Sequence, residues 1–289
     1  MEDFEMLNGI IDMHLHPAPA THVRRYDFLQ ITKQAAEVKM RAIVLKPMEF
    51  TSMDKVYAAE KFVPGIRVFG GIVLDNAVGG LNPEAVEKAI KLNSKFIWMP
   101  VFDALNTRKR TELVPSYKTM IDATKPSLTV LDPAGKLRPE VKKIIEIIVK
   151  AKGVALATGH ISPEESIALI DEAKSKGIEH VVVTHVSSTI IGATIEQQKI
   201  MAGKGAILEH VWTICLPRPD RQGQHPSEIA NAIKAVGPKH CVMATDLGNY
   251  YHHPVDGFRS YILHMKALGI GDDEINIMTR ENPAKILGI

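Results

Sequence analysis

Cysteine is scarce in this sequence, which has only Cys215 and Cys241 among its 289 residues. The two are spaced neither as a C-x-x-C pair nor as a disulfide framework, so a reducing, cytoplasmic setting is expected. Long apolar runs are also lacking, which excludes a membrane-spanning helix. The acidic start, residues 1–5, has no apolar signal-peptide core, and we expect a soluble intracellular protein.

An excess of charge of one sign is absent as well: 35 Lys and Arg stand against 33 Asp and Glu, for a formal net charge of +2. The charges are scattered, which argues against the concentrated basic face of a nucleic-acid-binding protein. The short basic clusters Arg24-Arg25 and Arg108-Lys109-Arg110 are interpreted as solvated surface. The expected partner is a small-molecule substrate, with neither nucleic acid nor a membrane involved.

Apolar runs rich in β-branched residues recur along the chain, and each precedes a segment with helical periodicity. They are almost continuously apolar, which is typical of parallel strands covered on both faces. The eight runs are Gly9–His16, Ala42–Lys46, Val68–Leu74, Phe96–Phe102, Val154–Thr158, His180–Thr184, Ala206–Leu208 and Cys241–Thr245.

Helix signals separate these runs, as in Asn82-Pro83 and Ser162-Pro163, where a capping residue precedes a proline. The length allows one large barrel or two medium domains. Eight β-α units predict an α/β fold, a (β/α)8 TIM barrel, as a single domain over residues 1–289. The alternative, an open doubly wound sheet, would need a glycine-rich turn after its first strand, where this chain has histidines.

The interval after the fourth strand is too long for one β-α unit and predicts an insertion at about residues 103–138. Its end, residues 128–137, has the pattern of a small hairpin with a Pro-Ala-Gly turn. Such a loop at the catalytic end of a barrel serves as a lid or specificity element. A packing loop, or a contact between subunits of a homo-oligomer, is an equal alternative.

The first run ends in Asp12-Met13-His14-Leu15-His16-Pro17. Because side chains alternate along a strand, His14 and His16 project to the same side. Two neutral imidazoles on one face can coordinate a divalent transition metal.

Other strand ends also carry polar residues, and a barrel brings the carboxyl ends of its strands together. Glu209 and His210 are adjacent, so only one can face inward, and we favour Glu209. Burying many titratable groups is costly unless something such as a metal pairs them. The candidates beside His14 and His16 are Lys46, His160, His185, Glu209 and Asp246.

The segment Ile11–Pro17, with His160, His185 and Asp246, gives the chain a resemblance to the amidohydrolase superfamily of metal-dependent hydrolases. A closing Asn282-Pro283-Ala284 motif that continues to Leu287-Gly288 adds to this resemblance. The resemblance implies a barrel that holds one or two divalent metals, commonly zinc, which activate water. It implies that His14, His16 and Asp246 ligate one metal, and that His160 and His185 ligate a second or assist it. Asp246, which also accepts a proton, and His185 are the expected catalytic residues.

Where two metals are bound, the resemblance implies that a carboxylated lysine or a glutamate at the end of the fourth strand bridges them. This chain has neither residue at that position. The well-placed lysine is Lys46, where burial would favour the neutral amine that carbon dioxide carbamylates. Lys46 is therefore expected to be a carbamylated bridging ligand or a substrate contact, with a paired structural lysine as the alternative. Glu209 could be a ligand or hold a histidine in its metal-binding tautomer. Asp103 is a weaker substitute bridge.

The predicted function is a metal-dependent hydrolase that cleaves an amide, cyclic amide, ester or lactone bond. The alternatives are a metal-dependent lyase or decarboxylase, which needs one metal, and a non-catalytic metal-binding protein. The arginines of loop 217–225 would clamp a substrate carboxylate or phosphate, or be solvated. His22, His252 and His253 are equally well explained as surface residues.

Overall fold

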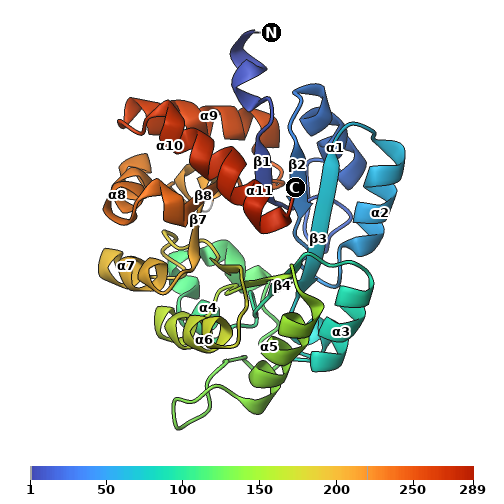
Figure 1. Ribbon diagram of the computed structural model, residues 1–289, viewed down its shortest axis with the longest axis vertical. Coiled ribbons are helices and arrows are strands. Elements are labelled where there is room, and N and C mark those ends of the chain that lie inside the picture. The colour runs from blue at the N-terminus through green and yellow to red at the C-terminus, as the bar shows by residue number, and fades with distance from the viewer. Residues whose placement is uncertain (1, 220) are drawn as a thin grey trace.

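The computed structural model describes residues 2–219 and 221–289 and shows eight parallel strands in the order β1 to β8, each paired with the next (Figure 1). The predicted (β/α)8 TIM barrel is thereby confirmed. The strands are β1 (Ile11–Leu15), β2 (Ala42–Leu45), β3 (Arg67–Val73), β4 (Phe96–Trp98), β5 (Ala155–Ala157), β6 (Val181–Val183), β7 (Ile207–Val211) and β8 (Cys241–Ala244).

The barrel closes between β8 and β1 at the carboxyl ends of these strands, through a parallel bridge between Leu15 and Leu247. The amide of His16 donates to the carbonyl of Leu247 at 2.8 Å, and the amide of Asp246 donates to the carbonyl of His14 at 2.9 Å. The backbone that joins the first and last strands is therefore the backbone of the histidine pair and of Asp246.

Helices surround the ring of strands (Figure 1). The predicted caps at Asn82 and Ser162 are present, since each side chain accepts a hydrogen bond from the first turn of its helix. The α-helices are α1 (Phe28–Glu37), α2 (Met53–Phe62), α3 (Pro83–Lys91), α4 (Leu105–Lys109), α5 (Pro139–Ala151), α6 (Pro163–Ser175), α7 (Ile195–Gly203), α8 (Pro226–Val236), α9 (Pro254–Ala267), α10 (Asp272–Asn276) and α11 (Asn282–Leu287). The shorter helices are η1 (Glu2–Leu7), η2 (Asn76–Val78), η3 (Thr111–Leu113), η4 (Pro115–Thr119), η5 (Trp212–Cys215), η6 (Pro238–His240) and η7 (Ile277–Glu281).

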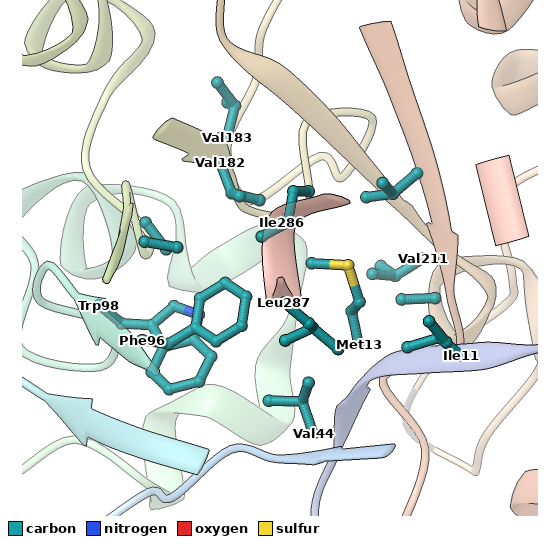
Figure 2. Close-up of a cluster of buried hydrophobic side chains, with 14 of the residues drawn as sticks. Ile11, Met13, Val44, Phe96, Trp98, Val182, Val183, Val211, Ile286 and Leu287 are labelled. Atoms are coloured by element: carbon teal, nitrogen blue, oxygen red, sulfur yellow. The ribbon is translucent and has the colours of Figure 1, made fainter. Parts of the chain in front are cut away.

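The core lies inside and around the barrel, and α11 closes its amino-terminal end. Figure 2 shows Ile286 and Leu287 of α11 among buried side chains of the strands, such as Met13 and Val44. The Asn282 amide donates to the carbonyls of Pro238 and Cys241, just before and at the start of β8, at 3.0 and 2.7 Å. The sealed end is therefore opposite the end that carries the histidines.

The predicted insertion after β4 contains α4, η3 and η4. The expected hairpin at its end is reduced to a turn, with one antiparallel bridge between Leu131 and Leu137 and a hydrogen bond from Gly135 to Asp132 at 2.9 Å. Among the described residues, no helix is both long enough and apolar enough to cross a membrane.

Candidate metal centre

His14 in β1, His16 directly after it and Asp246 meet at the carboxyl end of the barrel. The Nε2 atoms of His14 and His16 are 3.1 Å apart. Oδ1 of Asp246 lies 3.0 Å from Nε2 of His16 and 3.4 Å from Nε2 of His14. Three donor atoms from the first and last strands therefore converge on one point.

The Nδ1 atom of each of these two histidines already has a hydrogen-bond partner. Nδ1 of His16 is 3.1 Å from the backbone carbonyl of Lys46, which can only accept, so this nitrogen carries the proton. Nδ1 of His14 is 3.0 Å from Oε2 of Glu209. With its proton on Nδ1, His16 directs an Nε2 lone pair at Asp246, and His14 does the same when Glu209 is ionised and accepts from its Nδ1. Two imidazole lone pairs and a carboxylate are a donor set that fits a divalent transition metal.

His185 adds a further nitrogen to this set. Its Nε2 lies 3.4 Å from Nε2 of His14 and 3.7 Å from Oδ2 of Asp246. One donor atom from each of His14, His185 and Asp246 lies within 4.8 Å of the other two. His185 and Asp246 follow β6 and β8 with φ angles of 51° and 53°, a conformation that is uncommon outside glycine and is found at functional sites.

A chain of hydrogen bonds determines the tautomer of His185. The hydroxyl of Thr107, in the insertion, donates to the carbonyl of Val101 at 2.6 Å. Its oxygen must then accept from Nδ1 of His160 at 3.3 Å, which leaves Nε2 of His160 to accept from Nδ1 of His185 at 3.1 Å. Nε2 of His185 is left without a proton and faces Asp246. In this arrangement His160 lies behind His185.

Burial sets the charge states of the centre. It lowers the pKa of His14 and of His16 to about 3, so both imidazoles are neutral. Burial alone would raise the pKa of Asp246, but His185, His14 and His16 outweigh it and hold that pKa well below its usual range. Neutral histidines and an ionised carboxylate are the forms in which these groups would coordinate a metal.

Two carboxyl groups support the centre from outside. Glu209 lies behind His14, and burial raises its pKa to about 8. Asp12, whose structural role was not apparent in the sequence, accepts hydrogen bonds from the amides of His14 and Thr245 and, at 2.5 Å, from the Thr245 hydroxyl. Asp12 therefore ties β1 to β8 beneath the histidine pair.

The centre opens into a small cavity of about 50 Å³ at the mouth of the barrel. Lys46 reaches it from the end of β2, with Nζ 5.9 Å from the centre of the Trp98 ring, and burial lowers the pKa of this amine. The lining residues are His16, Arg24, Lys46, Met48, Val101, Phe102, Tyr117, Met120, His160, His185, Thr213, Arg218, Arg221, Asp246 and Asn249.

Several residues lie elsewhere than their sequence position indicated. Asp103 is not part of the centre, because its two oxygens bind the Arg108 guanidinium at 2.6 Å and the amide of Asn76 at 2.8 Å. Arg24, expected at the surface, lines the cavity instead. Its place in the loop that follows the histidine pair was the signal that could have found it.

The remaining histidines lie outside the donor set. His210 is directed away from Glu209 and contacts the Ser187 hydroxyl through Nδ1 at 2.9 Å. His252 contacts the carbonyl of Pro217 at 3.0 Å, and His253 caps α9. His22 contacts the Thr21 hydroxyl at 3.1 Å, away from the metal ligands.

Solved structures share the fold across nearly the whole chain. A probable 2-pyrone-4,6-dicarboxylic acid hydrolase from Acinetobacter baumannii, with citric acid bound, has a TM-score of 0.62 at 13% identity, with 97% of this chain and 100% of that chain covered. An organophosphorus hydrolase from Deinococcus radiodurans has a TM-score of 0.62 at 10% identity, with 99% and 94% covered. A 2,6-dihydroxybenzoate decarboxylase has a TM-score of 0.57 at 10% identity, with 98% and 100% covered.

The chain thus shares its fold with these solved enzymes, which is the barrel that the strand pattern predicted. No curated protein sequence matches the chain. Residues 9–209, which include every strand from β1 to β6 and most of the site, match a family model described as a family of unknown function, DUF6282. The chain belongs to this family.

Proposed function

We propose that the protein is a metal-dependent hydrolase that cleaves an amide, cyclic amide, ester or lactone bond of a small molecule. The observation that carries this proposal is the convergence of the Nε2 atoms of His14 and His16 on the Asp246 carboxylate, at the open end of the barrel. The similar structures are mostly hydrolytic enzymes, which supports an enzymatic role.

His14, His16, His185 and Asp246 would hold the metal, which we take to be zinc because the donor set is imidazole and carboxylate. When bound, a divalent ion supplies a lowered water pKa and polarises the substrate carbonyl. One ion is favoured, because the Thr107–His160 bond leaves His160 behind His185, where it orients that ring.

Asp246 has the charge and position of a general base. Its pKa lies well below the usual range, and its carboxylate lines the cavity where a substrate would bind. It would accept a proton from the attacking water and return it to the leaving group. The bond from the Asp246 amide to the His14 carbonyl, at 2.9 Å, fixes the residue against β1 during this exchange.

Lys46 is proposed to contact the substrate, because its amine reaches the cavity and burial keeps it partly desolvated. A carbamylated Lys46 that bridges two ions is the competing role. Intact-mass measurement at neutral pH in bicarbonate separates the two, since a carbamate adds the mass of carbon dioxide to wild type and not to Lys46→Arg.

A decarboxylase is the second candidate, favoured by the one-metal donor set and by the similarity to a decarboxylase. The decisive experiment combines metal analysis of the purified protein with product analysis on a panel of lactones, cyclic amides and aromatic carboxylic acids. Hydrolysis products that disappear in His14→Ala support the proposal. Carbon dioxide release without hydrolysis favours the decarboxylase, and no bound zinc contradicts both.

A further inference from the structure

Tyr117 brings the insertion after β4 into the cavity of the candidate metal centre. The residue lies in η4, and its side chain lines the cavity together with those of His185 and Asp246. The proposed function so far uses the insertion only through Thr107, which orients His160. The insertion therefore places a second side chain at the site, with a role that has not been assigned.

Packing holds the Tyr117 ring in one orientation. The ring lies parallel to the imidazole of His160, with 6° between the two planes and 6.0 Å between the ring centres. It is nearly perpendicular to the ring of Phe102, at 85° and 5.2 Å. The ring also packs against a small buried cluster, which consists of Val114, Ile190 and Ile191. A side chain held on several sides keeps its polar atom in a fixed place, as a preorganised donor requires.

The start of the insertion is anchored beside the metal centre. The side-chain amide of Asn106 donates to the carbonyls of His160 and Ile190 at 3.1 and 3.0 Å. Nε of Arg110 donates to the carbonyl of Thr189 at 2.9 Å. Ile190 and Thr189 belong to the loop after β6. The insertion is therefore fixed to that loop, on the side of the barrel mouth where Tyr117 enters the cavity.

The Tyr117 hydroxyl is available to a bound molecule. Among the residues that the structure describes, this hydroxyl has no hydrogen-bond partner. Burial raises the pKa of Tyr117, the charge of Asp246 raises it further, and the charge of Arg221 opposes the rise. The phenol therefore keeps its proton at neutral pH and can donate a hydrogen bond.

The size of the cavity determines what this hydroxyl can reach. The cavity has a volume of about 50 Å³, and both Tyr117 and Asp246 line it. A space of this size admits the reacting group of a substrate and excludes most of the rest of the molecule. A carbonyl group that binds beside Asp246 therefore also lies beside the Tyr117 hydroxyl.

We propose that Tyr117 is a catalytic residue whose hydroxyl donates a hydrogen bond to the carbonyl oxygen of the substrate. This inference rests on the proposed hydrolase function and deepens it. As the oxygen of water bonds to the carbonyl carbon, the second electron pair of the C=O bond moves onto its oxygen, and Asp246 takes the water proton. The hydrogen bond from Tyr117 strengthens as this negative charge develops, while Tyr117 keeps its own proton.

Tyr117→Phe in zinc-loaded protein tests the donor, because it removes the hydroxyl and keeps the ring contacts with His160 and Phe102. On the best substrate of the panel, kcat should fall about a hundredfold, with KM changed less than about threefold. Calorimetric titration with methylphosphonate, a tetrahedral oxyanion, should show binding about tenfold weaker than to wild type. Tyr57→Phe is the control, since Tyr57 is 70% exposed on α2, and should match wild type in both measurements.

Zinc affinity of Tyr117→Phe should equal that of wild type. A kcat unchanged from wild type would overturn the proposal, and so would a loss of activity that weaker zinc binding explains, since Tyr117 would then position the metal ligands. If wild type hydrolyses nothing on the panel, the hydrolase proposal fails and methylphosphonate decides about Tyr117. Weaker binding by Tyr117→Phe supports the contact with an oxyanion, whereas equal binding, or no binding by wild type, overturns it.

Discussion

At the scale of single residues, the left-handed backbone of Asp246 is a constraint on what can replace it. Asp246 lies shortly after the end of β8 and has a φ of 53°. Its amide donates a hydrogen bond to the His14 carbonyl. Asparagine tolerates this conformation better than most residues, whereas larger side chains are strained in it. Asp246→Asn therefore removes the carboxylate charge with little disturbance of the backbone.

Asp246→Asn is expected to lower hydrolysis about a hundredfold or more, the usual effect of losing a general base, and to weaken zinc binding. The melting temperature of the metal-free protein should change little. Turnover on the best substrate of the panel, zinc calorimetry and thermal melts give the three readouts. Activity close to wild type in this variant would remove Asp246 from the mechanism.

At the scale of elements, Gly248 fixes the distance between the loop after β8 and the end of β1. It has a φ of 133°, and a Cβ built on it would overlap the backbone carbonyl of His16. Only glycine allows this close approach. The position of His16 therefore depends on Gly248, although this glycine has no side chain that could contact the metal donors.

Gly248→Ala is expected to destabilise the protein by more than about 1 kcal/mol and to lower zinc affinity, because His16 must shift. Gly65→Ala is the matched control: its φ is 89°, yet no atom lies within 4 Å of the added Cβ. The control should lose stability through strain alone and bind zinc normally. Denaturant unfolding and zinc titration measure the two effects. Unchanged zinc affinity in Gly248→Ala would contradict this role.

The sequence predicted the strands and the polar residues at their ends, because strands and helices each have a characteristic spacing of apolar residues. Alternation along β1 places His14 and His16 on one face, and a barrel brings strand ends such as that of His185 together. The loop position of Arg24 after the histidine pair indicated the barrel mouth, but not that its side chain lines the cavity, because the loop is placed by pairing with the distant Asn249. The relation of His160 to His185 likewise depends on Thr107, which lies in the irregular insertion.

At the scale of the whole molecule, the sealed end of the barrel is held by hydrogen bonds, and the open end carries the candidate metal centre. The Asn282 side chain donates to carbonyls at the start of β8, and the Arg280 guanidinium donates to the carbonyls of Met6 and Asn8 ahead of β1. Arg280 and Asn282 therefore join the segments that lead into the first and last strands at the sealed end. At the open end the same two strands are joined through the residues of the metal centre.

Because the donors lie in β1 and just after β6 and β8, an ion bound to them would cross-link the two sides of the barrel closure and stabilise the folded state only. Zinc at about a hundred times its Kd should add about 2.7 kcal/mol to the free energy of unfolding. For a chain of this size that raises Tm by about 5 °C, and a chelator should reverse it. His252→Ala, outside the donor set, should respond like wild type, and His14→Ala should not respond. An equal shift in His14→Ala would show that zinc binds elsewhere.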